Sequence, residues 1–190
     1  MHILIGLGNP GKEYEHTRHN AGRMTLQAFA KKMECGEWSM NKKYQSLKTE
    51  GSLKRDSFTL LLPETFMNKS GNALKELRVM SNKSWGEKLI ILHDDIDLLL
   101  GRFKISFGKG SGGHKGLESV MRALKTKDFV RVRIGISPKK KPPHKEIPDF
   151  LLKKMNAKDT VELKKMFKKI SEAIEVIIEE GYEKAMNVYN

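Results

Sequence analysis

His19 is the residue of this sequence best placed to take a proton during catalysis. It lies in a polar run, residues 12–20, that follows an apolar stretch and a glycine-rich turn and comes just before a helical pattern. Histidine titrates near neutral pH, and a general base needs one ring nitrogen free while an acceptor holds the other. A carboxylate fixes both the tautomer and the orientation of the ring. A base at His19 therefore requires a carboxylate that the fold brings to it.

Three aspartates, Asp94, Asp95 and Asp97, come shortly after the apolar run 88–92. An apolar run that ends in carboxylates is typical of a buried strand that delivers polar groups at its C-terminal end. Asp94 comes first after the strand, so we expect it to pair with His19. The sequence has no nucleophile elbow and no sign of a reactive cysteine, which favours activation of water over attack by a side chain.

The glycine turn before this polar run admits another interpretation. Gly6, Gly8 and Gly11 match the dinucleotide-binding fingerprint and follow a predicted strand. In that motif a helix begins at the turn, whereas here the helical pattern begins only at about Ala21, and no acidic residue closes a second strand about 20 residues on. We expect instead a tight turn that lets a substrate approach the backbone and that presents the amide of Asn9.

A metal site is a second alternative. His16 and His19 are three positions apart and, with the aspartates, could offer nitrogen and oxygen ligands if the segment were helical. The spacing is not a strong metal signature and the segment is not predicted to be helical. A metal-dependent esterase, which inactivation by EDTA would favour, therefore stays as an alternative.

The composition indicates a polyanionic partner and an intracellular location. The 190 residues carry a net charge of +13, which favours nucleic acid first and an anionic membrane second, although a lysine-rich proteome would give the same surplus. The single cysteine, Cys35, rules out a disulfide within the chain and fits a reducing compartment. No apolar run is long enough to span a membrane and no signal-peptide pattern is present, so we expect a cytoplasmic protein.

The elements needed to hold these residues alternate along the chain. We predict an α/β fold of three layers in a single domain over residues 1–190, with a mixed, mostly parallel sheet flanked by helices. A loop at 65–71 leads to a helix at 73–80 that residues 81–84 break, and a helical segment at about 146–190 contains a long amphipathic helix. No long exposed apolar stripe is evident, which favours a monomer. The predicted strands are 2–5, 44–53, 57–62, 88–92, 103–107 and 130–136, and the other predicted helices are 21–33, 117–124 and 157–180.

The polar clusters 9–20, 93–97 and 108–115 each follow a predicted strand, and the C-terminal ends of strands in an open α/β sheet meet at one crevice. We therefore expect the three clusters to converge. Taken together and in this order, their motifs resemble those of bacterial-type peptidyl-tRNA hydrolase over about residues 1–150. The matching stretches are GLGNPG at 6–11 with Tyr14, TRHNAG at 17–22, TFMNKSG at 65–71, HDDID at 93–97, GSGGHKG at 110–116 and RVRIGI at 131–136.

The resemblance implies hydrolysis of the ester between a peptide and tRNA, which recycles tRNA from stalled translation. His19 would activate water and Asp94 would hold His19 in its basic form. Asn9 would sense the blocked amine and so spare aminoacyl-tRNA. The resemblance implies no metal or organic cofactor and no obligate protein partner.

The same resemblance implies a substrate groove and a phosphate clamp. Lys104 and Arg133 would hold a terminal phosphate of the tRNA. Lys115 replaces the asparagine that the family carries, and it brings three donors but no acceptor. A catalytically weak, RNA-binding relative of the same fold is therefore a further alternative. The residues implied to contact substrate along the groove are Tyr14, Phe66, Asn68, His114 and Lys115.

Overall fold

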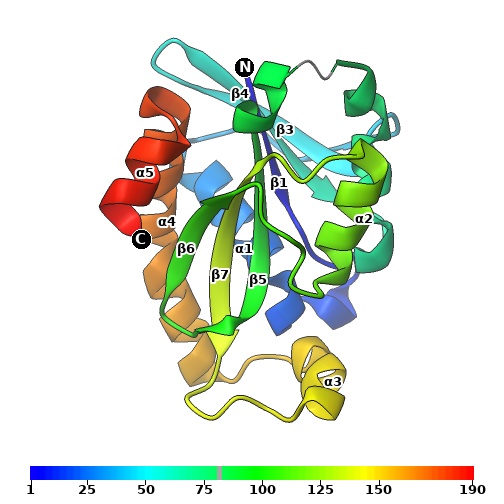
Figure 1. Cartoon of the computed structure of the whole chain (residues 1–190), viewed down its shortest axis with the longest axis vertical. Coiled ribbons are helices and arrows are strands. Elements are labelled where there is room, and N and C mark those ends of the chain that lie inside the picture. Colours follow the sequence, from blue (N-terminus) through cyan, green and yellow to red (C-terminus); the bar gives the residue numbers. More distant parts are fainter. Residues whose placement is uncertain (81–82) are drawn as a thin grey trace.

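A seven-stranded mixed sheet is the central layer of the fold (Figure 1). The computed structural model places residues 1–80 and 83–190, and describes the side chains of 1–75 and 85–190. The strands are β1 (His2–Gly6), β2 (Ser39–Asn41), β3 (Ser46–Leu53), β4 (Asp56–Pro63), β5 (Leu89–Leu99), β6 (Phe103–Phe107) and β7 (Val130–Ser137). Their order is β2-β3-β4-β1-β5-β7-β6. The central strands β4, β1, β5 and β7 are parallel, and antiparallel pairs close both edges.

Helices cover both faces of the sheet, which confirms the predicted three-layer fold. One face packs against α1, α4 and α5, and the other against η3 and α2. The helices are α1 (Ala21–Lys32), α2 (Lys115–Leu124), α3 (Ile147–Leu152), α4 (Ala157–Glu180) and α5 (Tyr182–Tyr189). The 3-10 segments are η1 (Lys12–Tyr14), η2 (Arg18–Asn20), η3 (Met67–Met80), η4 (Lys83–Lys88) and η5 (His144–Glu146).

Burial on both faces explains why β1 reads as a continuous apolar run. Leu4 faces the core formed with α1 and α4, while Ile3 and Ile5 face the core formed with η3 and α2. A central parallel strand is covered on both sides, so its residues do not alternate between apolar and polar. The start of α1 at Ala21 and the bounds of α4 are as predicted.

β5 is longer than predicted, because residues 93–97 belong to the strand rather than following it. β1 ends beside β5 at the pair Gly6 and Leu92, but β7 continues, with Asp94 opposite Ile134. Pairing with β7 therefore keeps residues 93–97 extended. On its other side, where β1 has ended, β5 has no neighbouring strand among the residues that the structure places. Asp94 lies in this part of β5.

Three further boundaries differ from the sequence prediction. The helical segment after β4 begins at Met67, within the stretch predicted as a loop, and α2 begins at Lys115 rather than at residue 117. Of the predicted break at 81–84, residues 83 and 84 instead begin η4, and residues 81 and 82 lie outside the described residues. The short elements β2, α3 and α5 were not predicted individually, because each offers too few residues for a periodic pattern.

The edge strand β6 is covered by the C-terminal helix. The ring of Tyr182 stacks on Phe107 with centroids 4.7 Å apart, and Tyr189 lies 6.1 Å from Phe103. The side chain of Asn190 accepts a hydrogen bond from the backbone N–H of Ile105 at 2.7 Å and donates one to its carbonyl at 2.9 Å.

Candidate active site

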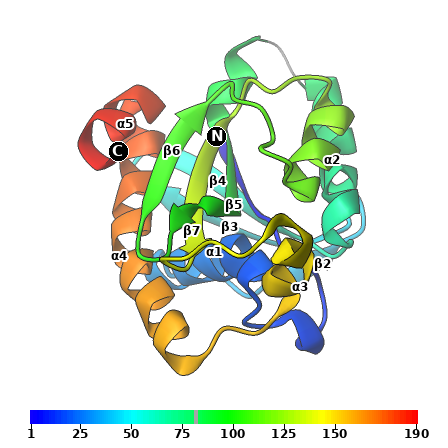
Figure 2. The ribbon, with the colours of Figure 1, turned by 60° about the horizontal axis from the view of Figure 1, so that its bottom comes forward.

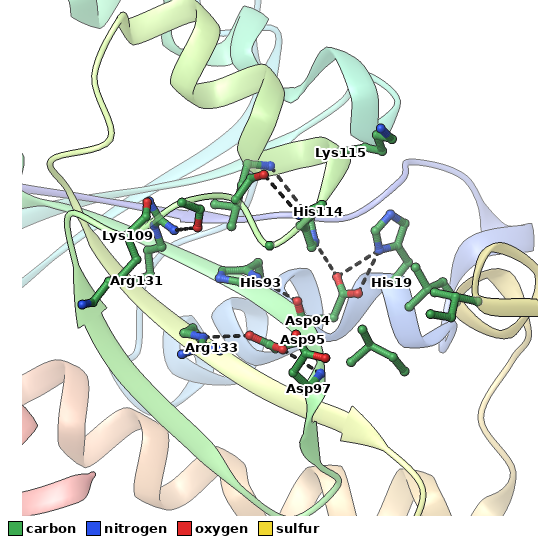
Figure 3. Close-up of a pocket in the computed structure, with 18 of the residues that line it drawn as sticks. His19, His93, Asp94, Asp95, Asp97, Lys109, His114, Lys115, Arg131 and Arg133 are labelled. Carbon is green, nitrogen blue, oxygen red and sulfur yellow. Dashed lines mark hydrogen bonds and ion pairs between the residues drawn. The ribbon is translucent and has the colours of Figure 1, made fainter. Parts of the chain in front are cut away.

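A cavity of about 430 Å³ opens where β5 passes the end of β1 (Figure 3). Residues from distant parts of the sequence meet around it, including His19 beside α1, Asp94 on β5 and His114 before α2. The sheet side carries cations from β7, and α3 contributes an apolar wall. This juxtaposition confirms that the three polar clusters converge.

A close approach of α1 to the sheet places His19. Gly22, in the first turn of α1, lies so near β5 that a Cβ atom there would be 2.2 Å from the carbonyl oxygen of Leu92. The backbone N–H of Arg23 donates to the carbonyl of Leu7 at 2.9 Å. The helix therefore begins against the ends of β1 and β5, and η2 presents His19 to β5.

His19, Asp94 and His114 form one hydrogen-bonded cluster. Nδ1 of His19 lies 3.0 Å from both carboxylate oxygens of Asp94, and Nε2 of His114 lies 2.9 Å from Oδ1. Nδ1 of His114 accepts from the backbone N–H groups of Gly116 and Leu117 at 3.1 and 3.2 Å, so its proton is on Nε2. Asp94 thus accepts from both imidazoles, and Nε2 of His19 is left as an acceptor. In Figure 3 this nitrogen points away from Asp94.

The charges of the cluster reinforce this arrangement. Burial alone would raise the pKa of Asp94, but the two imidazoles, through charge and hydrogen bonds, hold that pKa well below its usual range. Burial disfavours protonation of His19, yet the charge and hydrogen bond of Asp94 outweigh it, so the pKa of His19 is raised above 6.5. Asp94 is therefore ionised at neutral pH and increases the proton affinity of His19.

The glycine-rich loop reaches the cluster by a route that the sequence did not reveal. β6 is antiparallel to β7, so its C-terminal end lies at the opposite end of the sheet from Asp94. The prediction that residues 108–115 reach the crevice because they follow the C-terminal end of a strand was therefore wrong. Residues 108–114 run back along the sheet with Gly112 and Gly113 at φ of 60° and 80°. They end at His114, which caps α2.

Arg131 holds this returning loop. Arg131 is 2% exposed, and its guanidinium donates to the carbonyl of Gly110 at 2.6 Å and to that of Lys109. It also lies 4.8 Å from the centroid of the Phe129 ring. These contacts fix the loop to β7 and so help to place His114.

His93 is a buried histidine beside the cluster. Its Nδ1 lies 2.7 Å from the backbone carbonyl of Asp94, and its ring centroid is 5.0 Å from that of His114. Burial is the main reason that the pKa of His93 is lowered to about 3, with the charge of His114 adding to the effect. His93 is therefore neutral and donates its Nδ1 proton to the Asp94 backbone.

The glycine turn fixes the amide of Asn9. Asn9 exchanges two hydrogen bonds with the side chain of Asn20, at 2.8 and 2.9 Å, through its backbone. Its side-chain oxygen accepts from the backbone N–H of Met67 at 2.7 Å. This bond assigns the orientation of the amide and leaves Nδ2 with no protein partner in the described part of the chain.

The other predicted groove residues lie on the surface near this turn or near α2. The rings of Tyr14 and Phe66 meet edge to face with centroids 6.2 Å apart, and Phe66 is 54% exposed. Asn68 is also exposed. Nζ of Lys115 is 3.2 Å from Oε2 of Glu118 and is exposed, so it is not in contact with the His19 cluster.

Of the two predicted phosphate-clamp residues, Arg133 lines the cavity and Lys104 does not. Arg133 lines the cavity and its Nε donates to Oδ2 of Asp95 at 2.7 Å. Lys104 is paired directly opposite Arg133 in the antiparallel ladder, so both side chains leave the same face. Lys104 itself is exposed and does not line the cavity. Lys141 lines it and forms an ion pair with Asp97.

The histidine pair considered as a metal site is not formed. His16 is exposed, and the one group among the described residues that could hold a metal consists of His19, Asp94 and His114. Their facing atoms are joined by hydrogen bonds, so an ion would have to displace two protons. The arrangement fits a carboxylate that orients a general base more directly than a metal centre.

Sequence reasoning missed several contributors to the site. His93 and Asp95 alternate with Asp94 along β5, a period of two that becomes visible only when the strand is extended through 93–97. Arg131 could have been found by the same alternation on β7. The part played by Ile147 and Leu151 of α3 depends on tertiary packing alone.

Comparison with known proteins points to one family. A family profile described as peptidyl-tRNA hydrolase matches residues 3–190. A peptidyl-tRNA hydrolase of Thermodesulfovibrio yellowstonii is 38% identical over 193 aligned positions, covering 100% of this chain and 99% of the relative. One of Thermoanaerobacter sp. strain X514 is 40% identical, with 100% of both chains covered.

Solved structures show the same fold. A crystal structure of peptidyl-tRNA hydrolase from Acinetobacter baumannii superimposes with a TM-score of 0.89 at 27% identity, covering 100% of this chain and 94% of that one. None of the helices in the described ranges has the length and apolar character needed to cross a membrane. The profile match, the full-length relatives and the shared fold together show that this chain belongs to the peptidyl-tRNA hydrolase family.

Proposed function

We propose that this chain hydrolyses the ester bond between a peptide and tRNA, with His19 as the general base that activates water. The observation that carries the proposal is the His19–Asp94–His114 cluster, in which Asp94 holds Nδ1 of His19 and leaves Nε2 free. The family to which the chain belongs supplies the substrate class.

The chemistry follows from the free nitrogen. Nε2 of His19 takes a proton from a water molecule as the water oxygen attacks the ester carbonyl. When the tetrahedral intermediate breaks down, the C–O bond to the ribose breaks and the imidazolium returns the proton to the leaving ribose oxygen. Asp94 stabilises the imidazolium during this interval and is not itself protonated, since its pKa is held well below its usual range by the two imidazoles despite burial.

His114 acts in this proposal as a positioning residue. Both of its ring nitrogens are engaged within the protein, one by the N-terminus of α2 and the other by Asp94. Sequence reasoning grouped His114 with the residues that contact substrate. Its contacts favour a role in orienting Asp94.

The substrate groove is assigned from the resemblance together with the contacts around Asn9. Nδ2 of Asn9 offers a donor for the carbonyl oxygen of the acyl group that blocks the substrate amine. The pair of Tyr14 and Phe66 offers an exposed aromatic surface beside the turn. The Arg133 guanidinium, oriented by Asp95, would receive a phosphate of the tRNA acceptor end with its two terminal nitrogens. The cytoplasm, where translation supplies the substrate, is the proposed location.

The deciding experiment compares N-acetyl-aminoacyl-tRNA with unblocked aminoacyl-tRNA. We expect release of tRNA from the blocked substrate only, and loss of that release in His19→Ala. Tight binding of tRNA without release by the unmodified protein would favour the alternative of an RNA-binding relative. Inactivation by EDTA that Zn²⁺ or Mn²⁺ reverses would favour the metal-dependent alternative, whereas we expect unchanged activity after EDTA.

Lys115 gives a second, narrower test. Because it forms an exposed pair with Glu118 and does not contact the cluster, we expect Lys115→Asn to alter KM more than kcat. A sharp gain in kcat would show that Lys115 impairs the site and would favour the weakly catalytic alternative.

A further inference from the structure

The turn that carries His19 is fastened to the far end of the chain. Arg18, the residue before His19, is 8% exposed. Its Nη2 donates to Oδ2 of Asp159 at 2.6 Å, and its Nη1 donates to the carbonyl of Lys153 at 3.3 Å. These partners lie 141 and 135 residues further along the sequence.

Three additional contacts join the same two segments. The guanidinium carbon of Arg18 lies 4.1 Å from the centroid of the Phe150 ring. Thr17 forms an isolated antiparallel bridge with Lys154, and the backbone N–H of Met155 donates to the carbonyl of His16 at 2.9 Å. Residues 16–18 are therefore held by the α3–α4 junction along their whole length, and Figure 2 shows α3 beside these N-terminal turns.

The junction also forms part of the cavity wall. Ile147 and Leu151, four residues apart on α3, line the cavity, while Phe150 of the same helix packs on Arg18. One helix thus touches the cavity with one side and the anchor of His19 with another. Since Arg18 is buried against Asp159 and does not line the cavity, contact with substrate does not explain its burial.

We propose that Arg18 is a positioning residue, which ties η2 to the α3–α4 junction and so holds His19 against Asp94 while α3 closes the cavity. The inference rests on the proposed role of His19 as the base. The ion pair is partly buried, with side chains 10% and 24% exposed, so forming it costs free energy of desolvation and removing one partner leaves an unpaired charge. The contact therefore fixes a geometry more than it adds stability, as a functional site requires.

The experiment uses Arg18→Lys, Arg18→Ala and Asp159→Asn in the full chain, with Glu162→Gln as control. Glu162→Gln removes a carboxylate from α4, the helix that carries Asp159. In the described structure Glu162 pairs only with the exposed Lys165. For each variant, kcat and KM are measured on N-acetyl-aminoacyl-tRNA. The pKa of His19 is measured by NMR on the free protein, with the signal assigned by its absence in His19→Ala.

We expect kcat to fall about tenfold or more in Arg18→Ala and Asp159→Asn with KM within about twofold, since a small displacement of a catalytic group slows the reaction strongly. The pKa of His19 should fall toward 6.5 in both, Arg18→Lys should recover part of kcat, and the control should match the unmodified protein. If Arg18→Ala does not fold, Asp159→Asn decides the question.

An unchanged pKa of His19, or a loss of activity explained by the unfolded fraction seen in circular dichroism, would overturn the positioning role. These results are distinct from failure of the proposed function. If His19→Ala retains activity, the base is another group, but the NMR titration still reports whether Arg18 and Asp159 position His19.

Discussion

Asp94 accepts hydrogen bonds from two imidazoles that have different tasks. His114, at the N-terminus of α2, donates to one oxygen of Asp94. Nδ1 of His19 lies within hydrogen-bond distance of both oxygens. Since each ring donates to the same carboxylate, the position of His19 depends on a residue 95 positions further on that need not touch substrate. The position of the proton on each imidazole ring therefore decides which nitrogen of His19 is free to accept a proton.

A first prediction concerns the pH dependence of the reaction. Burial disfavours protonation of His19, but Asp94 raises its pKa above 6.5, and only the neutral ring can accept a proton. We therefore expect kcat/KM to rise with pH through an apparent pKa above 6.5. In Asp94→Asn the attraction is lost, so the rise should move to lower pH while the plateau falls by roughly 10²–10⁴-fold. A pH–rate series on both proteins measures this, and an unmoved acid limb would contradict it.

Element positions decide whether these residues meet. α1 approaches β5 at Gly22, and residues 108–114 return along the sheet because Arg131 binds their carbonyls. Neither contact involves the reacting groups. Both set distances within the cluster, so they link packing to catalysis.

Gly22→Ala tests the first of these contacts. A Cβ at this position would lie 2.2 Å from the Leu92 carbonyl oxygen, so α1 must move away from β5 and take His19 with it. We expect a loss of about 1–3 kcal/mol in the free energy of unfolding and a fall in kcat beyond the unfolded fraction. Gly36→Ala is the control, because no atom lies within 4 Å of its built Cβ. Urea unfolding and kinetics on both variants check the prediction. Equal kcat in Gly22→Ala and Gly36→Ala would refute it.

The pairing of His19 with Asp94 was predictable because His19 comes just before a helical pattern and Asp94 just after an apolar run, and both patterns are plain in the sequence. The start of α1 and the bounds of α4 were predictable for the same reason, since each depends on local periodicity. The extension of β5 was not, because it depends on β7 continuing after β1 has ended. The path of residues 108–114 depends on the direction of β6, and the anchor of Arg18 on contacts across 141 residues. Such features follow from tertiary register, which no local pattern encodes.

The stability of the whole molecule should depend on pH through His93. Its pKa in the folded protein is lowered to about 3, mainly by burial, against 6.5 when unfolded. Between these values the unfolded chain binds the proton and the folded chain does not, so the free energy of unfolding falls as pH drops from about 6.5 to 3. We expect a shallower fall in His93→Gln than in the unmodified protein. Urea titrations across this window measure the slope, with His144→Gln, an exposed histidine, as control. Equal slopes in all three proteins would argue against it.

The amide of Asn190 has a consequence for how molecules behave toward one another. β6 is the outermost strand on its side of the sheet, and an uncovered edge strand can pair with a strand of another molecule. By occupying both backbone groups of Ile105, Asn190 blocks that pairing. We expect Asn190→Ala to aggregate at a lower temperature than the unmodified protein at equal concentration, as measured by light scattering, with Asn68→Ala as a surface control. An identical onset in all three would mean that α5 alone guards the edge against self-association.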